Sequence, residues 1–139
     1  SKDTIIAQSQ LAEAEKVVLD EAQSGLALIK RAMASYAESG YDPAYIANLG
    51  KSLNSVRGAL ILMNMSRAAK VVESCAQFVD TKLIRADASG AIQQLMDTFA
   101  DAVMSIEYFL EAYIAVHKQD HSILEIAEEC VGALGFPVN

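Results

Sequence analysis

Two histidines, His117 and His121, are the residues whose type and spacing most resemble a metal site. They lie four positions apart with Asp120 between them. On one continuous helix this spacing places both imidazoles on the same face, where they could bind zinc. However, Lys118, Gln119 and Asp120 interrupt the apolar periodicity, and no further Cys or His lies nearby in the sequence. We therefore predict no metal ligands here and interpret the two histidines as solvent-exposed loop residues.

The sequence contains no other pattern that predicts catalysis. It has no nucleophile elbow, phosphate-binding glycine loop or zinc motif. Ser52 and Ser55 have no His, Asp or Glu within one helical turn, so neither has the adjacent base that a serine nucleophile requires. Tyr108, Phe109 and Tyr113 predict an aromatic cluster in a core or an interface. We predict no cofactor and infer no small-molecule ligand.

The composition restricts the class of protein. A chain of 139 residues with 53% hydrophobic residues fits one globular domain. The net charge of −7 disfavours binding to nucleic acid or to anionic membranes. The longest apolar run, residues 59–63, is too short to span a bilayer, and no signal peptide is recognisable. These features predict a cytoplasmic protein without membrane insertion. Cys75 and Cys130 occupy apolar helical positions, which predicts buried, reduced thiols.

Apolar periodicity near 3.6 residues predicts five helices separated by short polar breaks. The start signals are Asp3 or Thr4, Asp42-Pro43, and a capping box of Ser122 and Glu125. The predicted helices span about residues 4–39, 43–63, 66–86, 91–117 and 122–134. The breaks fall at Ser39-Gly40, residues 87–90 and residues 118–120, and Gly135 ends the last helix.

The longest predicted stripe lies on the first helix. Its inward-facing residues are predicted to be Leu11, Ala14, Val18, Ala22, Gly25, Ile29, Ala32 and Tyr36. No segment alternates with period two, so no strand is predicted. Short connections favour antiparallel neighbours. The expected fold is all-α, an antiparallel up-and-down four-helix bundle with an additional short C-terminal helix.

The stretch LNSVRGALILMN, residues 53–64, joins a basic residue and a glycine, Arg57-Gly58, inside the second helix. A purely structural interpretation is available: Gly50 and Gly58 would let a neighbouring helix approach closely, and Arg57 would extend its apolar stem over the bundle surface. The sequence alone leaves this interpretation open.

Three stretches together favour more than that interpretation. They are SVRGALILMNMSRAAKVVE (55–73), FADAVMSIEYFLEAY (99–113) and DHSILEIAEECVGALGF (120–136). With them, about residues 4–136 resemble the histidine-phosphotransfer-like domains in the N-terminal part of CheA-type hybrid histidine kinases that govern type IV pili and twitching motility. The resemblance implies that residues 1–139 form one such helical domain, excised from a larger multidomain kinase.

The resemblance also places a particular residue at the reactive position. In the family a histidine three residues before Lys-Gly carries the phosphoryl group, and the matching residue here is Asn54, before Arg57-Gly58. A neutral imidazole offers a free lone pair at cytoplasmic pH. The amide nitrogen of asparagine has its lone pair delocalised into the carbonyl, so it is a very poor nucleophile. The domain is therefore predicted to lack phosphotransfer activity.

The function implied is that of a non-phosphorylatable interaction or scaffold module of a chemosensory histidine kinase regulating type IV pili. Its partner would be a protein: a receiver, a kinase or a sister histidine-phosphotransfer-like domain. Two alternatives remain open, namely an active phosphorelay domain that uses another acceptor, and a plain helical spacer or dimerisation bundle. The predicted docking face consists of Lys51, Asn54, Ser55, Arg57, Gly58 and Asn64.

Overall fold

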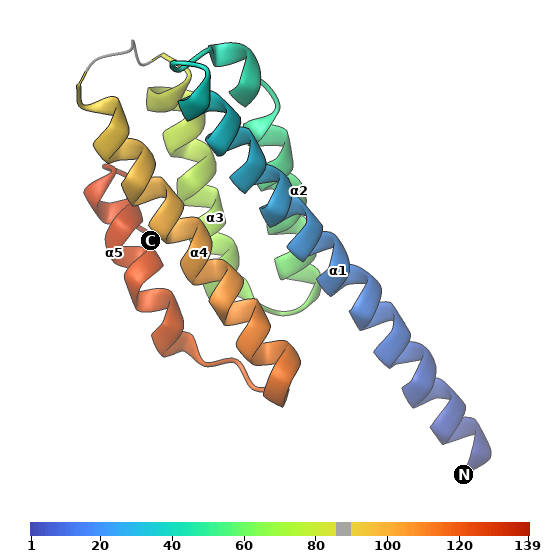
Figure 1. Ribbon diagram of the computed structural model, residues 1–139. Helices are drawn as coiled ribbons and strands as arrows, with labels where there is room; N and C mark the ends of the chain where they lie inside the picture. The colour runs from blue at the N-terminus through green and yellow to red at the C-terminus, as the bar shows by residue number, and fades with distance from the viewer. Residues whose placement is uncertain (86–89) are drawn as a thin grey trace.

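A computed structural model describes residues 1–85 and 90–139 of the chain, and within these ranges it contains helices and no strand. The all-α prediction is thus confirmed for the described residues. The elements in chain order are α1 (Lys2–Glu38), a 3₁₀ turn η1 (Pro43–Ile46), α2 (Leu49–Leu62), α3 (Ser66–Phe78), a π-helical turn η2 (Val79–Leu83), α4 (Ile92–Val116), a 3₁₀ turn η3 (His121–Ile123) and α5 (Leu124–Ala133) (Figure 1).

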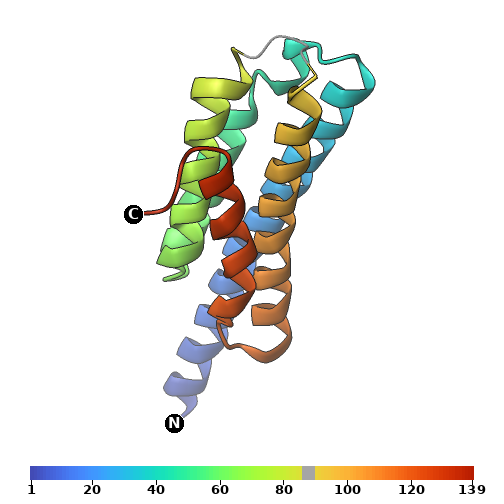
Figure 2. The ribbon, with the colours of Figure 1, turned by 90° about the vertical axis from the view of Figure 1, so that its left-hand side faces the viewer.

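Successive helices run in opposite directions, and α5 returns along the bundle between α3 and α4 (Figure 1, Figure 2). α1 packs against α2 and α4, α2 against α3, and α5 against both α3 and α4. The helices therefore form a ring in which α5 joins the α3 side to the α4 side. The short C-terminal helix is part of the bundle wall, because Leu124, Ala127 and Val131 are buried in the common core.

Aromatic rings fill the centre of this ring of helices. Tyr36, Phe78, Phe99 and Phe109 are among the largest side chains that are fully buried. The rings of Phe78 on α3 and Phe99 on α4 lie 5.7 Å apart with an interplanar angle of 57°, a tilted geometry that aromatic pairs favour. This contact joins α3 to α4 across the core. The residues that connect these two helices in sequence include 86–89, which lie outside the described part of the chain.

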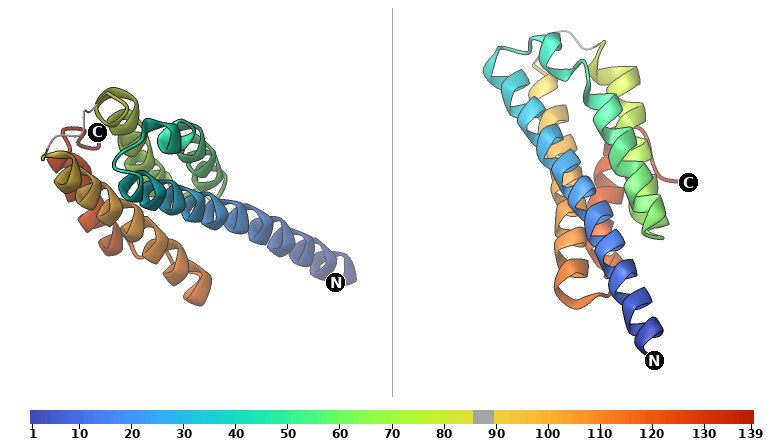
Figure 3. Two further views of the ribbon diagram at one scale, coloured as in Figure 1. Left: turned by 45° about the horizontal axis from the view of Figure 1, so that its top comes forward. Right: turned by 90° about the vertical axis from the view of Figure 1, so that its right-hand side faces the viewer.

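The N-terminal part of α1 projects beyond the other helices (Figure 3). The first buried residue of α1 is Leu19; Ala14 is exposed, and Leu11 is 62% exposed. The predicted inward positions at Leu11 and Ala14 are therefore wrong. At about 1.5 Å per residue, α1 extends about 55 Å and α2 only about 21 Å, so the start of α1 has no neighbour to pack against.

The starts of α1 and α2 differ from the predicted helix starts. Ser1 caps α1 by accepting a hydrogen bond from the Thr4 backbone N–H at 3.2 Å, so the predicted caps at Asp3 or Thr4 are wrong. Asp42 does cap a helical turn, since its Oδ1 accepts from the Ala44 N–H at 3.0 Å. That turn is only η1, however, and α2 begins six residues after Pro43, at Leu49.

The last helix also begins differently from the prediction. Asp120 Oδ1 accepts hydrogen bonds from both the backbone N–H and the hydroxyl of Ser122, at 3.1 and 2.6 Å. An aspartate two residues earlier thus caps η3, and the predicted capping box of Ser122 and Glu125 does not form. The prediction of a helical start here is confirmed, but the capping residue is Asp120, because Asp is as good a cap as Ser.

A lysine of η2 holds the C-terminal end of α5 against the bundle. Lys82 Nζ in η2 donates to the Leu134 carbonyl at 2.9 Å and lies 5.4 Å from the centroid of the Phe136 ring. Gly135 follows with φ +100°, a left-handed conformation that ends the helix as predicted. Near its middle, α5 is bound to α3 by a bidentate pair, in which Arg67 donates to the two carboxylate oxygens of Glu128 at 2.9 and 2.7 Å.

α1 and α2 approach one another tightly at Gly25. A Cβ atom built on Gly25 would lie 2.6 Å from Val56 Cγ2, which is a severe overlap. At Gly58 the same construction meets no atom within 4 Å. The close-approach interpretation is therefore wrong for Gly58, whereas Gly25 on α1 has this role toward α2. At Gly50 the nearest atom is a carboxylate oxygen of Asp80, at 2.9 Å.

The two glycines predict opposite effects of alanine. Gly25→Ala should lower the free energy of unfolding by about 1–2 kcal/mol, because overpacking against Val56 outweighs the better helix propensity. Gly58→Ala should raise it by about 0.5–1 kcal/mol, because the site is open and helical. Urea unfolding measures both. In a Val56→Ala background the destabilisation by Gly25→Ala should disappear; equal losses in both backgrounds would contradict the packing explanation.

Candidate functional site

Four of the predicted docking residues form one stripe on the outside of α2. Lys51, Asn54, Ser55 and Gly58 are all exposed and are spaced so that they lie on the same helix face. The opposite side of α2 packs into the core through Leu49, Leu53, Val56 and Leu60, each at most 2% exposed. Burial of that apolar side fixes the direction in which Asn54 faces, which is toward solvent.

Gly58 determines how accessible Asn54 is. Helical side chains incline toward the N-terminus, so a side chain at residue 58 would extend over residue 54, one turn earlier. Gly58 has no side chain and no other group within 4 Å of its Cβ direction. The carboxamide of Asn54 is therefore left uncovered from the C-terminal side of the helix.

The other two predicted docking residues are placed differently. Arg57 is half-buried and lies three positions from Asn54, on the flank of the stripe. Asn64 lies beyond the end of α2 in a left-handed conformation, with φ +58°. Ten residues of helix correspond to about 15 Å, so Asn64 lies well away from Asn54 along the axis. The Asn64 carbonyl instead accepts a 3.3 Å hydrogen bond from the Gln119 side chain.

Two exposed apolar residues adjoin the stripe and were missed by sequence reasoning. Ile61 and Leu62 are 50% and 73% exposed, and Leu62 lies one turn beyond Gly58 on the same face. We use "α2 outer face" for Lys51, Asn54, Ser55, Gly58 and Leu62. The available signal was the position of residues 61 and 62 outside the inward stripe of residues 53, 56 and 60.

The α2 outer face contains no activated nucleophile. Among the described residues, neither Ser52 nor Ser55 forms a side-chain hydrogen bond with a His, Asp or Glu. The carboxylate of Asp80 lies over Gly50, one turn before Asn54. An exposed carboxamide and a lysine can donate and accept hydrogen bonds there, which suits recognition of a polar partner surface.

The histidine pair is separated by the end of α4. His117 is the C-cap of α4 with φ +55°, and His121 begins η3 after the predicted break. Their rings contact different aromatic side chains: His117 lies 5.2 Å from Tyr113, and His121 lies 5.9 Å from Phe109. In the described part of the chain no group of three or more His, Cys, Asp or Glu side chains is placed to hold a metal ion.

The predicted aromatic cluster on α4 does not form. Phe109 is buried in the core, whereas Tyr108 is 53% exposed and Tyr113 is half-buried. Residues next to each other in a helix point in different directions, so closeness in sequence was a poor guide here. Tyr108 belongs to a surface groove between α4 and α5, described below.

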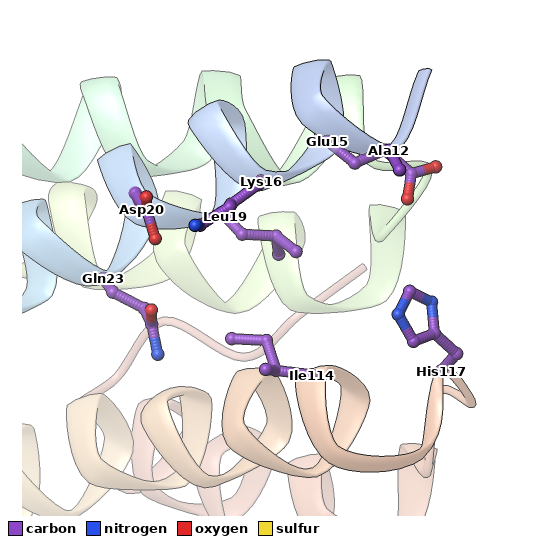
Figure 4. A pocket seen from close by; sticks show the side chains of 8 residues that line it. All are labelled: Ala12, Glu15, Lys16, Leu19, Asp20, Gln23, Ile114 and His117. Carbon is purple, nitrogen blue, oxygen red and sulfur yellow. The ribbon is translucent and has the colours of Figure 1, made fainter. Parts of the chain in front are cut away.

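A cleft of about 320 Å³ lies between the N-terminal half of α1 and the end of α4. Leu19 and Ile114 face one another across it, with His117 at one end (Figure 4). Its other lining residues are Ala12, Glu15, Lys16, Asp20 and Gln23. Acidic, basic and amide groups of α1 border it, and it contains no nucleophile paired with a base. The cleft results from the divergence of α1 from α4 and offers no catalytic arrangement.

Comparison with known proteins adds the family. Residues 9–131 match the model of the FimL C-terminal domain. The chain belongs to this family. The scaffold protein FimL of Pseudomonas aeruginosa is 42% identical over 130 residues, which is 93% of this chain and 23% of that protein. No solved structure shows a significant match.

The family match covers the α2 outer face and most of the helical bundle. This FimL-type domain spans less than a quarter of the length of the Pseudomonas protein, 23%. Among the helices that the structure describes, none is long and apolar enough to cross a membrane.

The two thiols of this FimL-type domain differ in burial. Cys75 on α3 is fully buried, as predicted, but Cys130 on α5 is only half-buried, and both are free. Burial raises the pKa of Cys75 to about 12, with a smaller contribution from Cys130. Burial, followed by the carboxylates of Asp101 and Glu129, raises the pKa of Cys130. Neither thiol is therefore activated as a nucleophile.

These pKa shifts predict low reactivity in the folded state. Because the thiolate is the reactive form, a shift of Cys75 from 9.0 to about 12 should slow its alkylation by iodoacetamide roughly 1000-fold relative to the urea-unfolded chain. Mass spectrometry of the labelled peptides measures this rate. The raised pKa favours the folded state below pH 9, and this contribution is lost as the pH rises from 9 toward 12. Rapid native labelling of Cys75 would contradict its burial.

Proposed function

We propose that this domain is a cytoplasmic, non-phosphorylated scaffold module that binds a protein partner of the type IV pilus chemosensory system through the α2 outer face. The observation that carries the proposal is the exposure of Asn54, which Gly58 leaves open because it has no side chain. Asn54 occupies the position where the resemblance implies a phosphoryl-accepting histidine. A surface kept open for a reactive residue, but carrying an amide, can bind a partner without reacting with it.

The family match supports the scaffold part of this proposal. The 42% identical relative is named a scaffold protein, and scaffolds act by holding other proteins. The comparisons give no support to a kinase parent, so the proposal relies on a helical shape of histidine-phosphotransfer type and not on kinase activity in the same chain. The proposed partner is a receiver, kinase or sister histidine-phosphotransfer-like domain, because such domains meet this helix face in active relays.

The composition of the α2 outer face also supports partner binding. Lys51, Asn54 and Ser55 provide polar contacts, and Leu62 provides an apolar contact that is 73% exposed. Protein interfaces combine an apolar centre with a polar rim in this way. Lys51 is a cation on a chain with net charge −7, and it would attract an acidic patch on the partner.

The absence of a nucleophile predicts no phosphorylation. The wild-type domain, incubated with a CheA-type kinase of the same organism and labelled ATP, should acquire no stable label. Asn54→His should acquire the acid-labile label of a phosphohistidine, because the imidazole then occupies the accessible position. Asn48→His is the matched control, since Asn48 is an exposed asparagine at the start of α2, six residues or about 9 Å along the axis before Asn54.

Each outcome of this experiment has a defined meaning. A stable label on the wild-type chain would overturn the proposal in favour of an active phosphorelay domain. An Asn54→His variant that is folded, as judged by circular dichroism, but labelled no better than Asn48→His would remove the support for the alignment of α2 with a phosphotransfer helix.

Partner binding predicts a specific effect of charge at the apolar end of the α2 outer face. Leu62→Asp in the full-length protein should reduce twitching motility severalfold, because a carboxylate cannot be buried unpaired in the interface. The thermal midpoint should stay within a few degrees, since the side chain is exposed. Ile5→Asp is the matched control, because Ile5 is 66% exposed on the projecting part of α1. Normal motility of both Leu62→Asp and Lys51→Glu would favour a plain spacer.

A further inference from the structure

A second apolar surface lies between α4 and α5, away from the α2 outer face. It is a groove of about 530 Å³ lined by Asp101, Met104, Ser105, Tyr108, Ile123 and Ile126, and we call it the α4–α5 groove. Met104, Tyr108 and Ile126 are 38%, 53% and 60% exposed. Three large side chains thus present apolar area to solvent in one place, which marks a site of interaction on a soluble domain.

The α4–α5 groove has a firmly held floor. Asp101, Met104, Ser105 and Tyr108 follow the helical spacing that keeps residues on one face of α4. At the centre, the Ser105 hydroxyl donates to the Ile123 carbonyl at 2.6 Å and fixes α4 to the start of α5. Residues 101 to 108 extend about 10 Å along the axis. The groove is therefore a preformed site that matches two turns of a helix.

The two helices that line the groove carry charged side chains of one sign. Neither α4 nor α5 contains Lys or Arg, while both contain several acids. Lys30 pairs with Glu107 at 3.2 Å, and Arg67 pairs with Glu128. Within the described ranges, the remaining acids of these helices form no ion pair, and they are Asp97, Asp101, Glu111, Glu125 and Glu129. Of these acids, Asp101 lines the groove itself, and Glu129 lies near Asp101 and Cys130 on α5.

We propose that the α4–α5 groove binds an amphipathic helix of a partner protein, with apolar side chains facing Met104, Tyr108 and Ile126 and with Lys or Arg flanking them. Helices bind in grooves of this kind through residues at i, i+3 or i+4 and i+7. Basic residues on either side of the apolar stripe would pair with Asp101 and Glu129. Both carboxylates lie near Cys130 on α5, since both raise the pKa of its thiol. The acidic border selects against acidic helices.

A second copy of this chain fits the groove poorly. In a two-fold symmetric dimer the same surface meets itself, so the acids of α4 and α5 would face one another. The exposed start of α1 is helical and partly apolar, but its Lys2 and Lys16 are accompanied by Asp3, Glu13 and Glu15. It thus offers no net positive charge. The border of the groove favours a basic partner from another protein.

This inference goes beyond the proposed function because it concerns the opposite side of the bundle. In the ring of helices, α2 is separated from α4 by α1 and from α5 by α3. The tilted view in the left panel of Figure 3 shows α2 and α5 on different sides of the bundle. Two partners could therefore be held at once, one on the α2 outer face and one in the α4–α5 groove.

The test uses a defined probe. A stapled helical peptide of about 15 residues carries leucine at i, i+4 and i+7 and lysine on both sides of this stripe. Its counterpart carries glutamate in place of lysine. Binding to the domain is measured by NMR titration, with resonances of Met104, Tyr108 and Ile126 as reporters. The lysine peptide should saturate these resonances and bind about tenfold more tightly than the glutamate peptide, and its affinity should fall as salt increases.

Variants locate the binding site. Ile126→Asn should weaken binding of the lysine peptide roughly tenfold, because it removes a large apolar contact. Asp101→Asn with Glu129→Gln should weaken it about threefold to fivefold and reduce the salt dependence. Ile5→Asn is the matched control, because Ile5 is similarly exposed but lies far from the groove; it should leave the affinity unchanged.

Three results would overturn the proposal. They are the absence of saturable shifts at millimolar lysine peptide, equal binding of the glutamate peptide, and shifts centred on α2 instead of α4 and α5. Sedimentation velocity supplies a fourth: a dimer of the wild-type domain that Ile126→Asn abolishes would assign the groove to a second copy. Failure here leaves the phosphorylation and Leu62 tests unaffected, since no residue of the groove lies on α2.

Discussion

The packing of α1 on α2 at Gly25 is the constraint on which the exposed surface of α2 depends. A side chain at that position would overlap Val56, so the helices can approach this closely only because the residue is glycine. Val56 lies in the middle of the inward side of α2, between Leu53 and Leu60. Once that side is held against α1, Asn54 and Gly58 are directed outward. The direction of the candidate site thus follows from a contact on the opposite side of the helix.

The α2 outer face presents an accessible amide with no activated nucleophile beside it, and this determines its chemistry. Asparagine can donate and accept hydrogen bonds without a charge and without a reactive lone pair. Together with Lys51 and the exposed Leu62, it forms the surface that we propose holds a partner. The two free thiols offer no alternative reactivity, since burial raises the pKa of both Cys75 and Cys130.

α5 gives the bundle its second surface. By packing between α3 and α4, it buries Leu124, Ala127 and Val131 and leaves Ile126 exposed beside Met104 and Tyr108. The Arg67–Glu128 pair and the Lys82 contact with the Leu134 carbonyl hold its two halves against α3 and η2. An exposed apolar groove flanked by acids results from this placement. The two proposed binding surfaces lie on opposite sides of the bundle, which would allow two proteins to be held together without a catalytic step.

The sequence by itself determined the helical class, most helix ends and the chemical inertness of residue 54. Apolar periodicity reports which side of a helix is buried, Gly40 and Gly135 report where a helix must stop, and an amide is a poor nucleophile in any fold. It did not determine which part of α1 is buried, because Leu11 continues the periodic pattern but has no neighbour there. Only the tertiary structure decided that, and it alone joined Tyr108 to Ile126 in the α4–α5 groove. Such juxtapositions depend on helix lengths and on packing between distant segments, and a local pattern carries no information about either.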